Sequence, residues 1–351
     1  MRLRCAVLDD FQQVATEIAD WSPVADDVDV VTFDTHFGEE DALAEALADV
    51  DIVVTLRERV SFPASLIARL PRLKLIVASG MRNSVIDYAA ADAHGVTVCG
   101  TASSSTPPVE LTWALLLGLA RGIVQESNAL RGGGPWQQTV GVDLHGRRLG
   151  LLGLGRIGGR VARVGLAFGM RVGAWSQNLT AERADEVGVE LAPSKEELLA
   201  TADFVSVHLA LGDRTRGLLG PAELALLKPT AYLVNTSRAA IVDQDALLAA
   251  LHEGRIAGAG VDVFDTEPLP SGHPMRTAPR VLATPHLGYV SRANYATYYG
   301  QAVEAIRAYL AGSPVRRLPA PPEPAPTAAP TLPPASDAQA IPSRADSAGR
   351  Q

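Results

Sequence analysis

The apolar residues in the first hundred positions fall into short runs separated by polar stretches. Asp, Gly or Pro flank these runs, which lack the alternation of apolar and polar residues that marks a strand with one solvated face. Such runs are typical of strands buried on both faces of a parallel sheet. Because residues 41–48 and 61–70 lie between them and carry apolar side chains at helical spacing, we predict a βαβ series. Its strands are expected at residues 5–8, 28–33, 52–55, 73–78 and 96–99.

A different pattern begins with Pro107 and Pro108, which can start a helix. Residues 109–121 are apolar on all sides, which predicts a helix buried at a domain or subunit interface. A second βαβ series follows, and residues 291–310 form one more amphipathic helix. We therefore predict an α/β protein with two doubly wound parallel sheets. The strands of the second sheet are expected at residues 149–152, 171–175, 189–191, 204–209, 232–235, 259–263 and 281–283.

Composition supports two domains and a separate tail. The chain has 351 residues, of which 47% are hydrophobic and 20% charged, enough for two ordinary cores. Residues 313–351 are rich in Pro, Ala and Ser and contain almost no large apolar side chains. This stretch cannot bury enough surface to offset the entropy of ordering it, so we predict a disordered tail. A passive tail is expected, and a Pro-rich ligand for a partner domain is the alternative.

Charge and cysteine content narrow the functional classes. The net charge is −8, and no cluster of Lys and Arg suggests a nucleic-acid partner. Cys5 and Cys99 lie far apart without metal-ligand spacing, so we predict no metal site and a reducing compartment. The first apolar run is too short for a signal peptide, and no apolar stretch is long enough to cross a membrane. A cytoplasmic protein without membrane partners is therefore expected.

A glycine-rich motif, GLGRIG at residues 153–158, lies between a predicted strand and a predicted helix that begins at Gly159. In this context the motif predicts a dinucleotide-binding turn. Gly153 permits the tight turn, Gly155 lets the backbone approach a pyrophosphate, and Gly158 allows the helix to pack closely on the strand. The free N–H groups at the helix N-terminus add a positive dipole end.

The choice between NAD and NADP remains open at this point. Dinucleotide folds that bind NAD usually carry an acidic residue at the end of the next strand, where it binds the ribose hydroxyls. Here Ser176 takes that place. Its hydroxyl can still bind a ribose, and its neutrality removes a charge that would repel a 2′-phosphate. No arginine stands directly beside it, and Arg183 is the nearest one downstream.

Three residues with complementary chemistry each follow a predicted strand: Arg238, Glu267 and His286. The carboxyl ends of parallel strands face one crevice, so these side chains can converge above the cofactor. Histidine can give or take the proton of a reacting ketone or alcohol, and Glu267 can hold its ring. Arginine presents a planar fork to a substrate carboxylate. We predict catalytic hydride transfer at this site, with the hydride chemistry supplied by the cofactor.

Four ordered motifs now identify a resemblance that spans roughly residues 50–312. They are LLGLGRIG at 151–158, VNTSR at 234–238, DVFDTEP at 262–268 and TPHLG at 284–288. The chain resembles the D-isomer-specific 2-hydroxyacid dehydrogenases, a family that includes phosphoglycerate, glyoxylate/hydroxypyruvate and D-lactate dehydrogenases. The resemblance implies an NAD(P)-dependent reductase of 2-keto acids, assembled as a homodimer.

The resemblance also implies domains and roles. Residues 1–103, completed by 288–312, would form a flavodoxin-like substrate domain, and residues 104–287 a Rossmann NAD(P)-binding domain. Asp262 would contact the nicotinamide amide, and the backbone N–H groups of a loop at 79–83 would hold the substrate carboxylate. The implied substrate-binding residues are Ser79, Gly80, Met81, Arg82 and Arg57. The implied cofactor-binding residues are Gly153, Gly155, Arg156, Ile157, Gly158, Ser176, His208, Thr236, Ser237, Asp262 and Gly288.

Some features depart from the family pattern or leave alternatives open. Ala239 follows Arg238 where the family usually has glycine, and Ser176 replaces the usual acid. Arg57, Arg59 and Arg82 are candidates for reaching a distal polar group of the substrate. Two other functions remain possible on this fold: oxidation of phosphite by a phosphite-dehydrogenase-like enzyme, and non-catalytic sensing of NAD(H) by a corepressor-like protein.

Overall fold

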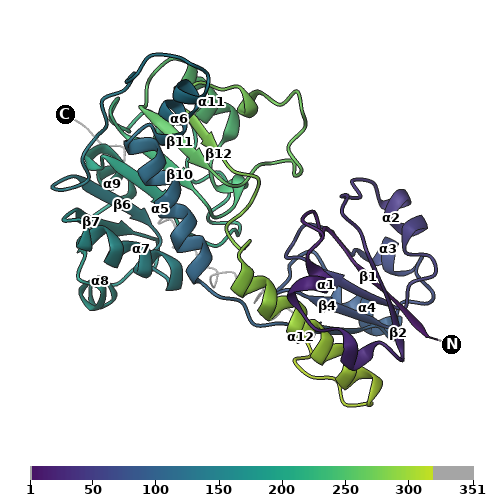
Figure 1. The fold of residues 1–351 in the computed structure, drawn as a ribbon. Coiled ribbons are helices and arrows are strands. Elements are labelled where there is room, and N and C mark those ends of the chain that lie inside the picture. The colour runs from purple at the N-terminus through teal and green to yellow at the C-terminus, as the bar shows by residue number, and fades with distance from the viewer. Residues whose placement is uncertain (1, 319–351) are drawn as a thin grey trace, which may run out of the picture.

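The computed structural model describes residues 2–318, which form two α/β lobes (Figure 1). The first lobe contains a five-stranded sheet with the order β2-β1-β3-β4-β5, and all its strand pairs are parallel. The strands are β1 (Leu3–Val7), β2 (Val28–Thr32), β3 (Ile52–Thr55), β4 (Leu75–Ala78) and β5 (Thr97–Gly100). The helices among them are α1 (Ala15–Ile18), α2 (Glu40–Ala46), α3 (Ala64–Ile67) and α4 (Tyr88–Ala93), with the 3-10 turn η1 (Ser22–Val24).

The second lobe contains a seven-stranded parallel sheet with the order β12-β11-β10-β9-β6-β7-β8. The strands are β6 (Arg148–Leu152), β7 (Arg171–Trp175), β8 (Glu190–Leu191), β9 (Phe204–Val207), β10 (Tyr232–Asn235), β11 (Gly258–Val261) and β12 (Val281–Ala283). The helices are α5 (Thr106–Ala120), α6 (Ile123–Arg131), α7 (Arg156–Ala167), α8 (Ala181–Val187), α9 (Lys195–Thr201), α10 (Pro221–Leu224) and α11 (Gln244–His252), with η2 (Ala239–Ile241) and η3 (Pro274–Arg276). The last helix, α12 (Arg292–Leu310), follows this sheet in the sequence but packs on the first lobe. The predicted fold class, two doubly wound parallel sheets, is confirmed, and every predicted strand lies within two residues of an observed one.

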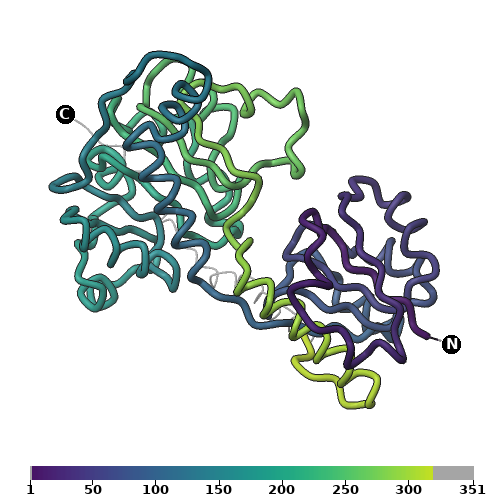
Figure 2. The backbone as a smooth tube through the Cα atoms, in the orientation of Figure 1, coloured from purple at the N-terminus to yellow at the C-terminus, as the bar shows by residue number. Residues whose placement is uncertain are grey.

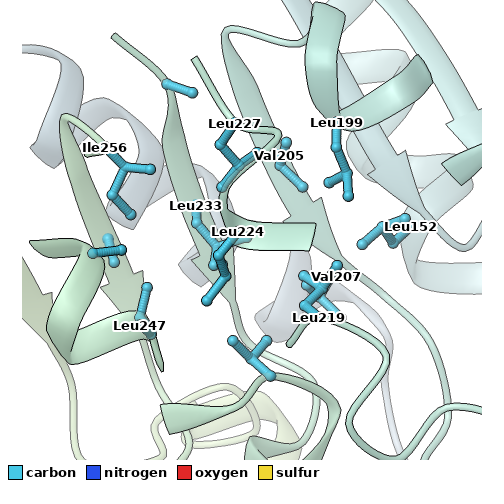
Figure 3. Close-up of a cluster of buried hydrophobic side chains, with 14 of the residues drawn as sticks. Leu152, Leu199, Val205, Val207, Leu219, Leu224, Leu227, Leu233, Leu247 and Ile256 are labelled. Carbon is cyan, nitrogen blue, oxygen red and sulfur yellow. The ribbon is translucent and has the colours of Figure 1, made fainter. Parts of the chain in front are cut away.

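Buried aliphatic side chains cover both faces of each sheet, which is why the strands read as unbroken apolar runs. In the second lobe, one such layer lies between the sheet and helices α9, α10 and α11. Figure 3 shows this layer, where strand residues such as Val205, Val207 and Leu233 pack against Leu199, Leu224 and Leu247. The sheet therefore provides a rigid base whose carboxyl edge can position functional groups.

The chain crosses between the lobes twice, once between β5 and α5 and again between β12 and α12 (Figure 2). After the second crossing, α12 packs on the first lobe, where it contacts α1, η1 and β4. Tyr295, Tyr298 and Tyr299 of this helix are buried in the same cluster as Cys5 and Val7. The expected division of the chain into 1–103 with 288–312, and 104–287, stays a prediction.

Helix α5 begins at Thr106 and is mostly buried within its own lobe, where it packs on α7, β10 and β11. Its apolar character is thus explained by the core of that lobe, and the prediction that it meets another domain or subunit is not needed to account for it. Among residues 2–318, no single helix is long and apolar enough to cross a membrane. Only α5 and α6 together meet that length and composition, and they are bent by 64°.

The predicted boundary of the disordered tail is wrong for residues 313–318. This segment runs along the outer edge of β5, where Arg316 accepts a hydrogen bond from the Gly100 N–H and Leu318 donates one to the carbonyl of Val98. The Arg316 guanidinium also pairs with Glu304 at 2.9 Å. The composition of residues 313–318 does not reveal this order, because the edge of β5 supplies the backbone hydrogen-bond partners. The rest of the predicted tail, 319–351, lies outside the described residues.

Candidate active site

The turn after β6 is built so that only glycine fits at two of its positions. Gly153 has a φ of +100°, and a Cβ there would lie 2.7 Å from the carbonyl oxygen of His208. A Cβ on Gly158 would lie 2.1 Å from the carbonyl oxygen of Gly153. A Cβ on Gly155, in contrast, would meet nothing within 4 Å. The backbone of Gly155 is therefore open to a ligand, and α7 begins directly after it, at Arg156 rather than at the predicted Gly159. This cradle fits the pyrophosphate of a dinucleotide.

The ends of β9 and β10 lie next to this turn, and their side chains are held by local bonds. His208 contacts the Ser206 hydroxyl at 2.9 Å, and burial lowers the pKa of His208 to about 4, so its ring is neutral near pH 7. The Thr236 hydroxyl is 2.9 Å from that of Thr112 in α5, a residue that the sequence did not mark. The Ser237 hydroxyl donates to the carbonyl of Leu209.

His286 and Glu267 form a pair at the carboxyl edge of the sheet. Nδ1 of His286 is 2.6 Å from a Glu267 carboxylate oxygen, and the other oxygen accepts the Phe264 N–H at 2.9 Å. Both side chains are about one-fifth exposed. Burial would raise the pKa of Glu267, but its contact with His286, the Phe264 N–H and the charge of Arg59 lower it overall. The carboxylate therefore stays ionised and orients the ring with Nε2 free for a substrate.

Asp262 fixes the loop that carries His286. It is fully buried, and its carboxylate accepts hydrogen bonds from the Thr284 hydroxyl at 2.6 Å and from the N–H groups of Leu287 and Gly288 at 2.7 and 2.8 Å. Burial raises the pKa of Asp262 despite these bonds. A contact between Asp262 and the nicotinamide stays a prediction. The structure adds that its carboxylate holds the His286 loop.

Arg238 reaches across to the first lobe. One terminal nitrogen of its guanidinium donates to the carbonyl of Ser237 at 2.8 Å, and the other forms an ion pair with Glu58. Glu58 also accepts a hydrogen bond from the Ser84 hydroxyl at 2.9 Å. Burial would raise the pKa of Glu58, but the charge of Arg238 and these bonds lower it. Sequence reasoning missed Glu58 because nothing local marks it.

The predicted substrate loop follows β4, and Arg57 lies against it. The Arg57 N–H donates to the Ser79 hydroxyl at 2.6 Å, and its guanidinium donates to the Ser79 carbonyl at 3.3 Å. The amide N–H groups of Ser79 and Gly80 already donate to Thr55 and Thr101 inside the lobe. These two amides are therefore not available to a carboxylate. Within residues 2–318, the loop amides without a bonded acceptor are those of Met81, Arg82 and Asn83, and the side chains of Met81 and Arg82 are exposed.

Arg59 of the first lobe contacts the loop that carries His286. Its guanidinium donates to the Tyr289 hydroxyl and, at 3.4 Å, to the carbonyl of His286. It lies 5.2 Å from the centre of the Phe11 ring and 5.5 Å from that of Tyr289. Arg59 thus supports the His286 loop from the first lobe, and a contact with a distal group of the substrate stays a prediction.

The predicted site residues come from both lobes. The carboxyl edge of the second sheet carries the phosphate turn, His286, Glu267 and Arg238, and the first lobe brings Glu58, Arg57 and the 79–83 loop to the same side. Among residues 2–318, no group of His, Cys, Asp or Glu is arranged to hold a metal ion. Cys5 and Cys99 are both buried and free.

Comparison with known proteins gives consistent matches. A family model described as D-isomer specific 2-hydroxyacid dehydrogenase, NAD binding domain, matches residues 113–288. The glyoxylate reductase of Aeropyrum pernix is 38% identical over 282 residues, which cover 78% of this chain and 83% of that protein. The D-3-phosphoglycerate dehydrogenase of Methanocaldococcus jannaschii is 36% identical, but the match covers only 48% of it and 71% of this chain. A phosphoglycerate oxidoreductase from Vibrio cholerae superposes with a TM-score of 0.84 at 36% identity, covering 89% of this chain and all of that one.

Proposed function

This chain belongs to the D-isomer specific 2-hydroxyacid dehydrogenase family, and we propose that it reduces small 2-keto acids with the Arg238, Glu267 and His286 side chains as its catalytic groups. It is an NAD(P)-dependent oxidoreductase. The observation that carries the proposal is the contact between His286 and Glu267 at 2.6 Å, at the same sheet edge as Arg238 and the phosphate turn. The geometry of these residues supports the roles that we propose for them.

When bound, the reduced nicotinamide supplies the hydride that adds to the keto carbon. His286 donates the proton that the developing alkoxide requires, from Nε2, because Nδ1 faces Glu267. The ionised Glu267 stabilises the positive charge on the ring before that proton leaves. In the reverse direction, the neutral ring accepts the proton of the hydroxy acid.

Arg238 binds the substrate carboxylate and polarises the neighbouring carbonyl, since its guanidinium is planar and always charged. The free amides of Met81 and Arg82 supply further donors from the opposite lobe. Two anchors on one carboxylate orient the keto carbon, and positioning of this kind is a large part of catalysis by such sites. The substrate is thus held between the two lobes.

The relative from Aeropyrum pernix is named a glyoxylate reductase, and this chain covers most of that protein. In contrast, the chain spans only about half the length of the D-3-phosphoglycerate dehydrogenases of Methanocaldococcus jannaschii, Bacillus subtilis and Mycobacterium bovis. We therefore propose a short 2-keto acid of the glyoxylate type as the substrate.

We further propose that the protein is a homodimer. Helix α6 has no buried residue, and the loop after it exposes 80% of Trp136 and 98% of Val140. Ile123, Val124 and Leu130 of α6 are also more than 40% exposed. Exposed apolar side chains that are close together in the sequence favour a surface that another protein covers. We refer to Ile123, Val124, Leu130, Trp136 and Val140 as the α6 patch.

An absorbance assay at 340 nm tests the reaction. Glyoxylate, hydroxypyruvate and pyruvate are offered with NADH and with NADPH, and phosphite is offered in reverse with each oxidised cofactor. We expect oxidation of a reduced nucleotide with at least one keto acid. Turnover of phosphite alone, or nucleotide binding by calorimetry without any turnover, would contradict the proposal.

A further inference from the structure

A hollow lies at the carboxyl end of β7, beside the phosphate turn. Side chains from two segments line it, the end of β7 and the loop after β9. Dinucleotide-binding sheets place the adenine ribose at this strand end, because the pyrophosphate lies on the glycine-rich turn of the preceding strand. The hollow is lined by Trp175, Ser176, Gln177, Asn178, Leu209, Arg214, Thr215 and Leu218.

The charge of this lining is positive. Among the residues that line the hollow, Arg214 is the only one with an ionisable side chain, and none carries a carboxylate. A carboxylate at the strand end would accept bonds from both ribose hydroxyls and would repel a 2′-phosphate. Ser176 offers a neutral hydroxyl in that place, and Asn178 offers an amide. The hollow therefore contains two hydrogen-bond donors, Ser176 and Asn178, and the positive charge of Arg214, whereas an NAD-specific site has a carboxylate at this strand end.

Local bonds hold Arg214 beside the end of β7. The Gln177 amide donates to the carbonyl of Arg214 at 3.4 Å, which ties the loop to the strand end. The Thr215 hydroxyl closes the turn, since it donates to the carbonyl of Ala210 at 2.7 Å and accepts the Gly212 N–H at 2.9 Å. These bonds fix the backbone of Arg214, and none of them involves its guanidinium group.

The Arg214 guanidinium has room to bind an anion. In the part of the chain that the structure describes, it donates no hydrogen bond and joins no ion pair. The other nearby arginine, Arg183, is occupied, because it donates to the carbonyl of Leu154 at 3.2 Å and pairs with Glu186 at 2.8 Å. Asp213 neighbours Arg214 in the chain but does not line the hollow.

We propose that this chain prefers NADP(H) to NAD(H), with Arg214 binding the 2′-phosphate of the adenine ribose and Ser176 and Asn178 donating hydrogen bonds to it. This inference deepens the proposed function and rests on the nucleotide lying as the phosphate turn places it. A planar guanidinium matches a phosphate group in geometry as well as charge. The sequence left the preference open because Arg214 comes from a different segment than Ser176.

Direct binding measures the preference without catalysis. The full-length protein is titrated by calorimetry with adenosine 2′,5′-bisphosphate, with 5′-AMP, and with NADPH and NADH. We expect the bisphosphate and NADPH to bind about tenfold to a hundredfold more tightly than their counterparts, as charge-assisted hydrogen bonds of this kind provide. Arg214→Gln should remove that difference and leave the affinity for NADH unchanged. Ser176→Asp should weaken NADPH and strengthen NADH.

Arg216→Gln is the matched control, because Arg216 is exposed on the same loop but does not line the hollow. Its nucleotide affinities should equal those of the unmodified protein. Tighter binding of NADH than NADPH, or equal weakening of both by Arg214→Gln, would overturn the inference. Reduction of a keto acid with NADH alone would overturn it too and leave the proposed function standing. Tight binding of the bisphosphate without turnover of any keto acid would support the inference and contradict the proposed function.

Discussion

Arg238 at the end of β10 is paired with Glu58 of the opposite lobe, and its other terminal nitrogen is bonded to its own backbone at Ser237. Both guanidinium arms therefore already have partners. A substrate carboxylate that uses the same fork must displace Glu58, whose side chain is about one-quarter exposed. In the role that we propose for Arg238, Glu58 occupies the place of the substrate carboxylate, and the ion pair joins the two lobes.

Replacing Glu58 by Gln should lower the KM for the keto acid by about fivefold, because a partly exposed ion pair contributes up to about 1 kcal/mol and no longer competes. The value of kcat should change less than the KM. Steady-state kinetics with glyoxylate measure both quantities. Glu304→Gln removes another ion pair, with Arg316, outside the proposed active site and serves as the control. A higher KM in the Glu58 variant would show that Glu58 orients Arg238 and does not compete.

Arg238→Lys tests the fork itself. An ammonium group retains the charge but cannot bind a carboxylate through two parallel hydrogen bonds. We expect a KM for the keto acid at least about tenfold higher, the equivalent of one charge-assisted hydrogen bond, and unchanged affinity for NADPH and NADH. Initial rates over a range of keto acid concentrations, with nucleotide affinity from calorimetry, measure this. A KM equal to that of the unmodified protein would refute the role of Arg238.

His286→Ala should lower kcat by about a hundredfold to ten-thousandfold, the usual contribution of a positioned proton donor. Nucleotide affinity should be preserved, because Asp262 still holds the loop through Thr284, Leu287 and Gly288. Single-turnover measurements at 340 nm report the chemical step directly. His252→Ala, on the exposed end of α11, is the control and should retain full activity. Retained turnover in the His286 variant would exclude it as the acid.

The parts of this molecule that follow from local patterns could be predicted from the sequence. A strand covered on both faces must be apolar at successive positions, so every strand was located to within two residues. The glycine motif at 153–158 has its own steric logic, since the Gly153 carbonyl leaves no room for a Cβ on Gly158. His286 and Glu267 each follow a strand of the same sheet, and this was enough to expect the two side chains to meet. Nδ1 of His286 lies 2.6 Å from a carboxylate oxygen of Glu267.

The parts that depend on distant segments could not be predicted. Glu58 and Arg214 act, in our proposals, on groups that other elements supply, and neither stands in a recognisable motif. The ordered stretch at 313–318 has the composition of a tail and is fixed by the edge of β5. The amides of Ser79 and Gly80 were assigned to substrate, but hydrogen bonds inside the lobe already use them. In each case, the deciding partner is far away along the chain.

The α6 patch should mediate the dimer. Trp136→Glu with Val140→Asp places two charges on this surface, and burying them in an interface would be unfavourable. We expect the unmodified protein to elute with the mass of a dimer in size-exclusion chromatography with light scattering, and the double variant with that of a monomer. Leu310→Glu, on a side chain that is 37% exposed at the end of α12, is the control for a charge added elsewhere. A dimer that persists in the double variant would place the interface on another surface.

Asp51 connects the amino ends of three strands in the first lobe, and its replacement should destabilise that lobe in a pH-dependent way. Its buried carboxylate accepts hydrogen bonds from the Arg4 N–H at 3.0 Å, from Arg72 at 2.9 Å and from Lys74 at 3.0 Å. Burial would raise the pKa of Asp51, but these contacts lower it below its usual 3.8. A lowered pKa in the folded state stabilises the protein above about pH 4, and this contribution disappears as the pH falls through the lowered value.

Asp51→Asn should therefore cost about 1–3 kcal/mol of unfolding free energy at pH 7 and progressively less below pH 4. Urea unfolding between pH 7 and pH 3, with the exposed Asp49→Asn as the control, measures the difference. A deficit that stays constant down to pH 3 would mean that packing, and not the ionised carboxylate, accounts for the role of Asp51.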